Sequence, residues 1–130
     1  MGPLVDTSVI VDAYAGRWTA AVGRLDALIR EGVTPATAPV ILQELLQGGR
    51  DEHAVRRIAH HMSGFEPLAA PSYVLHEHAA EIYRRARRAA LTASTVDVLI
   101  VATAAANHRP LLTSDAVQRR VAGLAGVELA

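Results

Sequence analysis

The apolar positions of the 130-residue chain fall into short runs that alternate with longer segments of helical periodicity. The short runs predict strands at residues 3–5, 33–38, 110–113 and 127–129, with a further short strand or connector at 65–68. The longer segments predict helices over residues 8–15, 18–30, 39–46, 52–62, 71–90, 96–107 and 116–122. Short strands separated by helices are typical of an α/β domain with a parallel sheet.

The segment Val96–Asn107 differs from the other predicted helices because its apolar residues surround the helix instead of forming one stripe. Such a helix is buried in the core of a domain. Asp97 lies in its first turn, so a carboxylate is expected at the edge of the core. Burying an unpaired carboxylate is costly, and a bound metal ion is one partner that relieves the cost.

Three more carboxylates stand where a site is expected. Asp6 comes directly after the first predicted strand, and Asp115 follows the strand at residues 110–113 almost at once. Glu44 is the only charged residue in its apolar helix, which follows the second strand. Because functional groups gather at the carboxyl ends of parallel strands, we expect these side chains to line one crevice with Asp97.

Carboxylates gathered in one crevice repel one another unless a cation joins them. Hard divalent ions prefer oxygen ligands. The pattern therefore predicts Mg²⁺ or Mn²⁺ on these four acids and metal-assisted hydrolysis of a phosphodiester bond. The alternative is structural, because Asp6, Asp97 and Asp115 all stand at or near helix N-termini, where Asp caps the helix. Glu44 could likewise be an ordinary solvated helix residue.

Composition excludes several other kinds of chemistry. The absence of cysteine excludes disulfides, thiolate metal sites and a cysteine nucleophile. All thirteen basic residues are arginine, and without lysine there is no P-loop phosphate site and no Schiff-base chemistry. Thirteen acidic residues balance them, so a nucleic-acid contact would have to be a local basic patch.

Targeting and membrane signals are not found in the sequence. The N-terminus carries no basic segment, and no apolar run approaches the roughly 20 residues that span a bilayer. The chain length corresponds to a single domain over residues 1–130. We expect a soluble, cytoplasmic protein that does not engage a membrane.

Four segments of the chain together resemble PIN-domain ribonucleases, and most closely the compact toxin of VapBC toxin–antitoxin pairs. The segments are Val5–Asp12, Leu42–Leu46, Thr95–Ala104 and Leu111–Asp115. Each motif is short, but their order, their spacing and the total length all match. The resemblance therefore covers essentially the whole chain.

The resemblance implies a PIN-like three-layer α/β/α sandwich with a short-stranded parallel sheet and a Mg²⁺- or Mn²⁺-dependent endoribonuclease site. It carries the acidic roles to Asp6, Glu44, Asp97 and Asp115, and a water-positioning role to Thr113. It also implies an RNA substrate, a homodimer and silencing by a small cognate antitoxin protein.

The sequence departs from the family pattern after Asp115. Many relatives carry a second acid and then an aromatic residue there, in places that hold Val117 and Gln118 in this chain. A second metal ion would then be weakly held or absent. The missing acid also supports an alternative function, a catalytically weak PIN-like module that binds RNA or a protein. A phosphatase of the haloacid dehalogenase type is a poorer alternative, because Ser8 stands where it would need an aspartate.

A basic cluster lies on the predicted helix 71–90 and is the candidate RNA contact. Its members are Arg84, Arg85, Arg87 and Arg88. An acidic crevice needs nearby positive charge to hold a polyanion, since metal ions alone contact few phosphates. The equally weighted alternative is a solvated helix face, in which Glu81 pairs with one of the arginines. The six histidines are adjacent or two apart where they cluster, so we expect them to be structural rather than metal ligands.

Overall fold

The computed structural model describes residues 1–68 and 72–130, and in them the chain forms four strands and seven helices. The elements are β1 (Leu4–Val5), α1 (Thr7–Tyr14), α2 (Ala20–Arg30), β2 (Ala36–Thr37), α3 (Pro39–Gln47), α4 (Glu52–Met62), β3 (Glu66–Pro67), α5 (Tyr73–Arg88), α6 (Thr95–Ala106), β4 (Leu111–Leu112) and α7 (Ala116–Leu124).

The four strands pair in parallel in the order β3-β2-β1-β4. Leu4 of β1 stands opposite Ala36 on one side and Leu111 on the other. The chain builds the sheet outward from β1 to β3 and then places β4 on the opposite edge of β1. The carboxyl ends of β1 and β4 therefore flank a topological switch point, where open α/β sheets bind their ligands.

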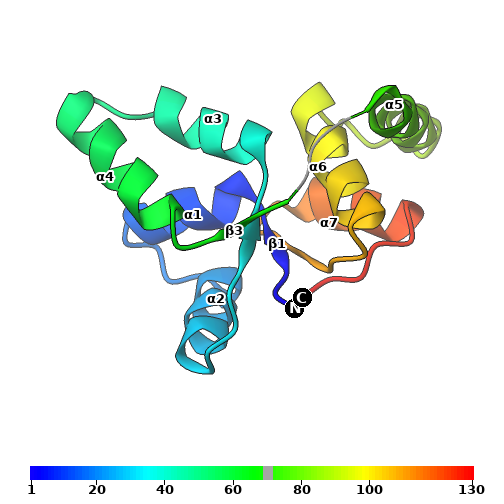
Figure 1. Ribbon diagram of the computed structural model, residues 1–130. Helices are drawn as coiled ribbons and strands as arrows, with labels where there is room; N and C mark the ends of the chain where they lie inside the picture. The colour runs from blue at the N-terminus through cyan, green and yellow to red at the C-terminus, as the bar shows by residue number, and fades with distance from the viewer. Residues whose placement is uncertain (69–71) are drawn as a thin grey trace.

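Helices cover both faces of this sheet. In Figure 1, α1, α3 and α4 lie on one side of the strands and α5, α6 and α7 on the other. Helices α5 and α6 pack closely against each other, and α7 contacts both. The arrangement confirms the predicted α/β/α sandwich with a short-stranded parallel sheet.

Helix α6 is the buried helix that the all-round apolar pattern predicts. Its residues from Val98 to Ala104 are buried with the exception of Leu99. Ser94 caps its N-terminus, and the Asp97 side chain completes a capping box by accepting a hydrogen bond from the Ser94 N–H. The helix runs antiparallel to the strands and precedes β4 directly, so its N-terminus and Asp97 lie at the carboxyl edge of the sheet.

Some predicted boundaries are wrong. The segment 127–129 forms no strand but a single parallel bridge, from Leu129 to Leu111. Helix α2 is shorter than the predicted 18–30 because Thr19 caps it, which leaves Trp18 outside the helix and 71% exposed. Ser72 caps α5, and the predicted helix start at Pro71 lies outside the described residues. Within the described ranges, no helix is long and apolar enough to cross a membrane.

Candidate metal-dependent nuclease site

Asp6 occupies the centre of the site, at the carboxyl end of β1. Its side chain is only 5% exposed, and as the N-cap of α1 it accepts the Ser8 N–H at 3.0 Å. The Thr113 hydroxyl donates to the same carboxylate at 3.3 Å, and the Gln118 amide donates at 3.1 Å. Each of these donors is neutral, so hydrogen bonds hold the carboxylate without cancelling its charge.

Glu44 lies on α3, and its carboxylate contacts the residue that follows Asp6. Thr7, the neighbour of Asp6 in the chain, donates from its Oγ1 to Glu44 Oε1 at 2.7 Å. Glu44 is half-buried, although its helix presents other polar side chains to solvent. The Glu44 carboxylate therefore accepts a hydrogen bond from the residue that follows Asp6 in the chain.

Asp115 reaches the same network from β4. Its backbone N–H donates to Thr113 Oγ1 at 3.1 Å, and that hydroxyl is the one that donates to Asp6. Its own carboxylate caps α7 by accepting the Gln118 N–H at 2.9 Å. Ser8 adds a further link, because its Oγ accepts the Ser114 N–H at 3.1 Å. Asp115 itself is exposed, so its outer oxygen is open to solvent.

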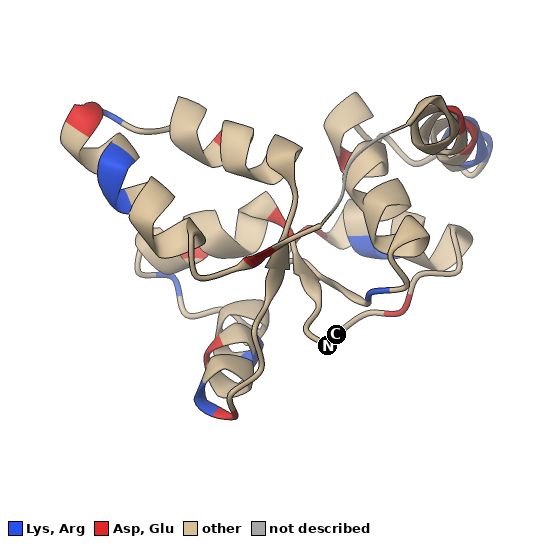
Figure 2. Cartoon of the chain, in the orientation of Figure 1, with Lys and Arg blue, Asp and Glu red and all other residues tan. Residues whose placement is uncertain are grey.

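Asp97 stands apart from this hydrogen-bonded group. Its carboxylate is half-buried and is engaged with Ser94 in the capping box, and no hydrogen bond among the described residues joins it to Asp6, Glu44 or Asp115. Figure 2 shows acidic segments on both α3 and α6, which rise on opposite sides of the strands in this view. Asp97 therefore caps α6, and this role is compatible with metal binding because a capping carboxylate can also face a crevice.

The chemistry of these donors fits a hard divalent cation. The four candidate ligands offer carboxylate oxygens, and in residues 1–68 and 72–130 none of them takes part in an ion pair. The same ranges contain no group of three or more His, Asp or Glu side chains close enough to hold a metal ion as they stand. Mg²⁺ keeps several of its waters and binds directly through one or two carboxylates, so a closed protein cage is not required.

Gln118 is a residue of the candidate site that the sequence does not single out. The family pattern indicates only that an aromatic residue is missing at this place, but the Gln118 side chain is 0% exposed and donates a hydrogen bond to Asp6. The spacing of the residues on α7 indicates that Gln118 is buried. Gln118 shares the buried face of the helix with Val121 and Ala122, three and four residues further on.

Tyr14 and His61 form a separate polar contact between the ends of α1 and α4. The tyrosine hydroxyl hydrogen-bonds to His61 Nδ1, and the two rings stack with their centroids 5.7 Å apart. Partial burial raises the pKa of Tyr14 above its usual value, and the positive charge of Arg57 opposes that rise. The contact ties two helices together and lies outside the acidic network.

The basic cluster on α5 divides into two parts. Arg85 pairs with Glu81 at 3.3 Å and donates to the Leu124 carbonyl of α7. Arg84, Arg87 and Arg88 instead line one surface hollow, and the Arg87 guanidinium lies 5.9 Å from the centre of the Tyr83 ring.

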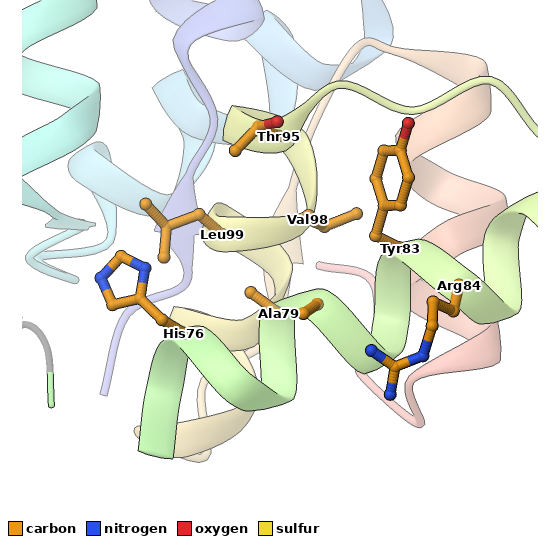
Figure 3. A pocket seen from close by; sticks show the side chains of 8 residues that line it. His76, Ala79, Tyr83, Arg84, Thr95, Val98 and Leu99 are labelled. Carbon is orange, nitrogen blue, oxygen red and sulfur yellow. The ribbon is translucent and has the colours of Figure 1, made fainter. Parts of the chain in front are cut away.

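That hollow adjoins an apolar cavity of about 330 Å³ between α5 and α6. Figure 3 shows the Tyr83 ring and Thr95 at one end of the cavity and His76 with Leu99 at the other. Arg84 lines both the cavity and the basic hollow. A further hollow shares His76 and Leu99 and reaches Gln43, the neighbour of Glu44. The three hollows therefore share lining residues in a series that extends from the arginines of α5 to Gln43 of α3.

Comparison with known proteins places the chain in a family. The family model of the PIN domain matches residues 4–124. Among proteins with curated functions, none matches the chain in sequence.

Solved structures of toxin–antitoxin complexes share the fold. A toxin–antitoxin complex from Klebsiella pneumoniae matches with a TM-score of 0.73 at 21% identity, covering 97% of this chain and 95% of the other. VapBC2 from Rickettsia felis, bound to a DNA fragment from its promoter, gives 0.76 at 19%, covering 100% and 98%. VapBC-1 from nontypeable Haemophilus influenzae gives 0.78 at 16%, covering 100% and 97%.

Nucleases of the PIN family generally depend on divalent metal ions, in agreement with an all-oxygen site at the switch point of the sheet. The family model spans nearly all of the chain, and the short-stranded parallel sheet is the one that the sequence resemblance implies. The chain belongs to the PIN-domain family of nucleases.

Proposed function

We propose that this protein is a metal-dependent endoribonuclease and the toxin of a toxin–antitoxin pair. The observation that carries the nuclease assignment is Asp6, a buried carboxylate at the switch point that is surrounded by neutral donors and linked to two further acids. A buried carboxylate without a counter-charge is costly unless a cation joins it. Membership of the PIN family supports the same chemistry.

In this proposal Asp6, Glu44, Asp97 and Asp115 hold one Mg²⁺ or Mn²⁺ ion, directly or through water. Such an ion lowers the pKa of a bound water and stabilises charge on the phosphoryl oxygens. Thr113 orients Asp6 and anchors the backbone of Asp115, while Thr7 orients Glu44. These hydroxyls keep the carboxylates in place before the substrate arrives.

The arginines of α5 supply the positive charge that an acidic crevice lacks. Arg84, Arg87 and Arg88 share one surface hollow, and neighbouring hollows extend from it to Gln43 of α3, so we assign these arginines to the phosphates of the RNA backbone. Arg85 contributes less, because Glu81 already pairs with it. Replacing one phosphate-contacting arginine should weaken RNA binding and reduce its salt dependence.

The partner assignment rests on the solved relatives, which were determined as toxin–antitoxin complexes. We propose that a small cognate antitoxin covers this protein and that the toxin pairs as a homodimer. Three exposed apolar side chains near the N-terminus, Val11, Tyr14 and Trp18, are available for such a partner, with Trp18 the most exposed of the three. Mass measured by light scattering, with and without a co-expressed upstream gene product, tests both assignments.

The decisive test of the nuclease assignment is RNA cleavage by purified protein with Mg²⁺, Mn²⁺ or EDTA. An Asp97→Asn protein and an Asp12→Asn protein are prepared identically. Asp12 also lies near the start of the chain but pairs with Arg17, so it is the matched control. We expect metal-dependent cleavage that Asp97→Asn abolishes and Asp12→Asn keeps.

Equal cleavage by wild type and Asp97→Asn would contradict the assignment and point to a contaminating ribonuclease. The second candidate function is a PIN-like binding module with weak or no catalysis, which Val117 in place of an acid favours. RNA binding without cleavage on a broad RNA panel, together with no Mn²⁺ binding, would favour that module.

A further inference from the structure

Gln118 is the most deeply buried polar residue beside the candidate metal ligands. Its side chain is 0% exposed, and its Nε2 donates to Asp6 Oδ1 at 3.1 Å. Its backbone N–H donates to Asp115 Oδ1 at 2.9 Å. One residue therefore contacts the two carboxylates that follow β1 and β4.

Chemistry fixes the orientation of the amide. If the group were rotated by half a turn, its oxygen would face the Asp6 carboxylate and the two would repel each other. The amide oxygen that points the other way, Oε1, is buried and has no hydrogen-bond partner among the described residues. An unpartnered buried acceptor costs free energy that an apolar side chain would avoid. The hydrogen bond from Nε2 to Asp6 is the interaction that offsets this cost.

The neutrality of this donor matters as much as its position. A lysine or arginine in the same place would neutralise Asp6 and compete with a metal ion. A carboxylate would repel Asp6 and leave its orientation to the ion. An amide fixes the direction of the Asp6 oxygens while the full negative charge remains for a cation.

We propose that Gln118 is a positioning residue that fixes the Asp6 carboxylate for a divalent ion. The inference rests on the proposed function, since it concerns the same site. Hydrogen-bond partners of metal ligands typically change metal affinity by 10–100-fold when they are removed.

The first test measures Mn²⁺ binding to the wild type, Gln118→Met and Thr103→Val by calorimetry. Methionine keeps the length and bulk of the side chain but cannot donate to Asp6. Thr103 is also buried and polar, but its hydroxyl donates only to the Leu99 carbonyl of its own helix, so it is the matched control. We expect Gln118→Met to bind Mn²⁺ 10–100-fold more weakly at an unchanged unfolding midpoint, and Thr103→Val to bind as the wild type does.

A second measurement needs no variant and so does not depend on whether Gln118→Met folds. The chain contains three glutamines and one asparagine, so the NMR spectrum of the labelled wild type has four side-chain amide pairs. The buried Gln118 amide should exchange slowly with solvent and shift on addition of Mg²⁺. The exposed Gln47 amide should do neither.

The outcomes separate the inference from the function on which it rests. If the wild type binds Mn²⁺ and Gln118→Met binds it equally well, with the Gln118 amide unmoved by Mg²⁺, the positioning role is overturned and the nuclease proposal stands. If the wild type binds no Mn²⁺ and no amide responds to Mg²⁺, both proposals are overturned.

Discussion

Both ends of the central sheet bury a charged side chain, but their surroundings differ. At the amino end, Arg109 is 6% exposed, donates to the Gly2 carbonyl at 2.8 Å and forms an ion pair with Glu66 of β3. At the carboxyl end, Asp6 is buried to the same degree, yet the donors around it are neutral. One charge is matched within the chain, and the other is not.

The difference separates a structural charge from a functional one. Arg109, which lies before β4, binds both Gly2 before β1 and Glu66 of β3, and the Glu66 carboxylate balances its charge within the chain. Asp6 has the burial of a structural residue without the electrostatic compensation, and for this reason we propose it as a site for an external cation. The predictions below test each half of this comparison.

The largest effect is expected at the unmatched end, from Asp6→Asn. Asparagine caps helices as well as aspartate does, and Gln118 can rotate its amide to accept from the new NH₂ group. The fold should therefore keep its stability to within about 1 kcal/mol. RNA cleavage should fall by at least about 100-fold, since a metal ligand matters more than the groups around it. A variant that cleaves normally, or one that fails to fold, would contradict the functional reading of Asp6.

At the amino end of the sheet, where the charge is paired, a substitution should lower stability and leave cleavage intact. Arg109→Met removes the bond to the Gly2 carbonyl and leaves Glu66 unpaired. Because the Glu66 side chain is 44% exposed and can rehydrate, we expect a loss of about 2 kcal/mol in the free energy of unfolding, less than for a fully buried pair.

Urea denaturation measures the Arg109→Met effect, with Arg85→Met as the control. Arg85 is 47% exposed and pairs with Glu81, so its loss should change stability by less than about 1 kcal/mol. The folded fraction of Arg109→Met should still cleave RNA. Lost cleavage in a fully folded Arg109→Met protein would break the distinction between the two ends.

A smaller effect is expected from Thr7→Val, which removes the hydroxyl that orients Glu44. Valine keeps the shape of the side chain, so the fold should be unchanged. We expect roughly a tenfold loss of cleavage, at the lower end of what partners of metal ligands contribute. Thr92→Val, at an exposed position, is the control. Equal cleavage by both variants would mean that Glu44 needs no orientation from Thr7.

The sequence predicts the elements that local patterns determine. The positions of Asp6, Asp97 and Asp115 at helix N-termini and the buried helix α6 are all confirmed. Each depends on residues a few positions apart, which is the range over which capping and periodicity act. The same local patterns predict that these three aspartates lie at the carboxyl edge of the sheet.

What the sequence could not predict depends on contacts between distant segments. The Gln118 amide meets Asp6 across 112 positions of the chain, and Arg109 meets Gly2 across 107. The wrong strand at residues 127–129 has the same origin. Its apolar residues suit a strand, but only Leu129 pairs with β4. Whether an apolar run forms a strand depends on how many of its residues can pair with a neighbouring strand.

Measuring the free energy of unfolding with and without Mg²⁺ tests the central claim most directly. A ligand raises this free energy only if it binds the folded state more tightly than the unfolded state. With Mg²⁺ at a hundred times its dissociation constant, the wild type and Arg109→Met should both gain about 2.7 kcal/mol. Asp6→Asn should gain nothing. An equal gain in Asp6→Asn, or no gain in the wild type at any Mg²⁺ concentration, would contradict the claim that the buried carboxylate at the end of β1 is a cation site.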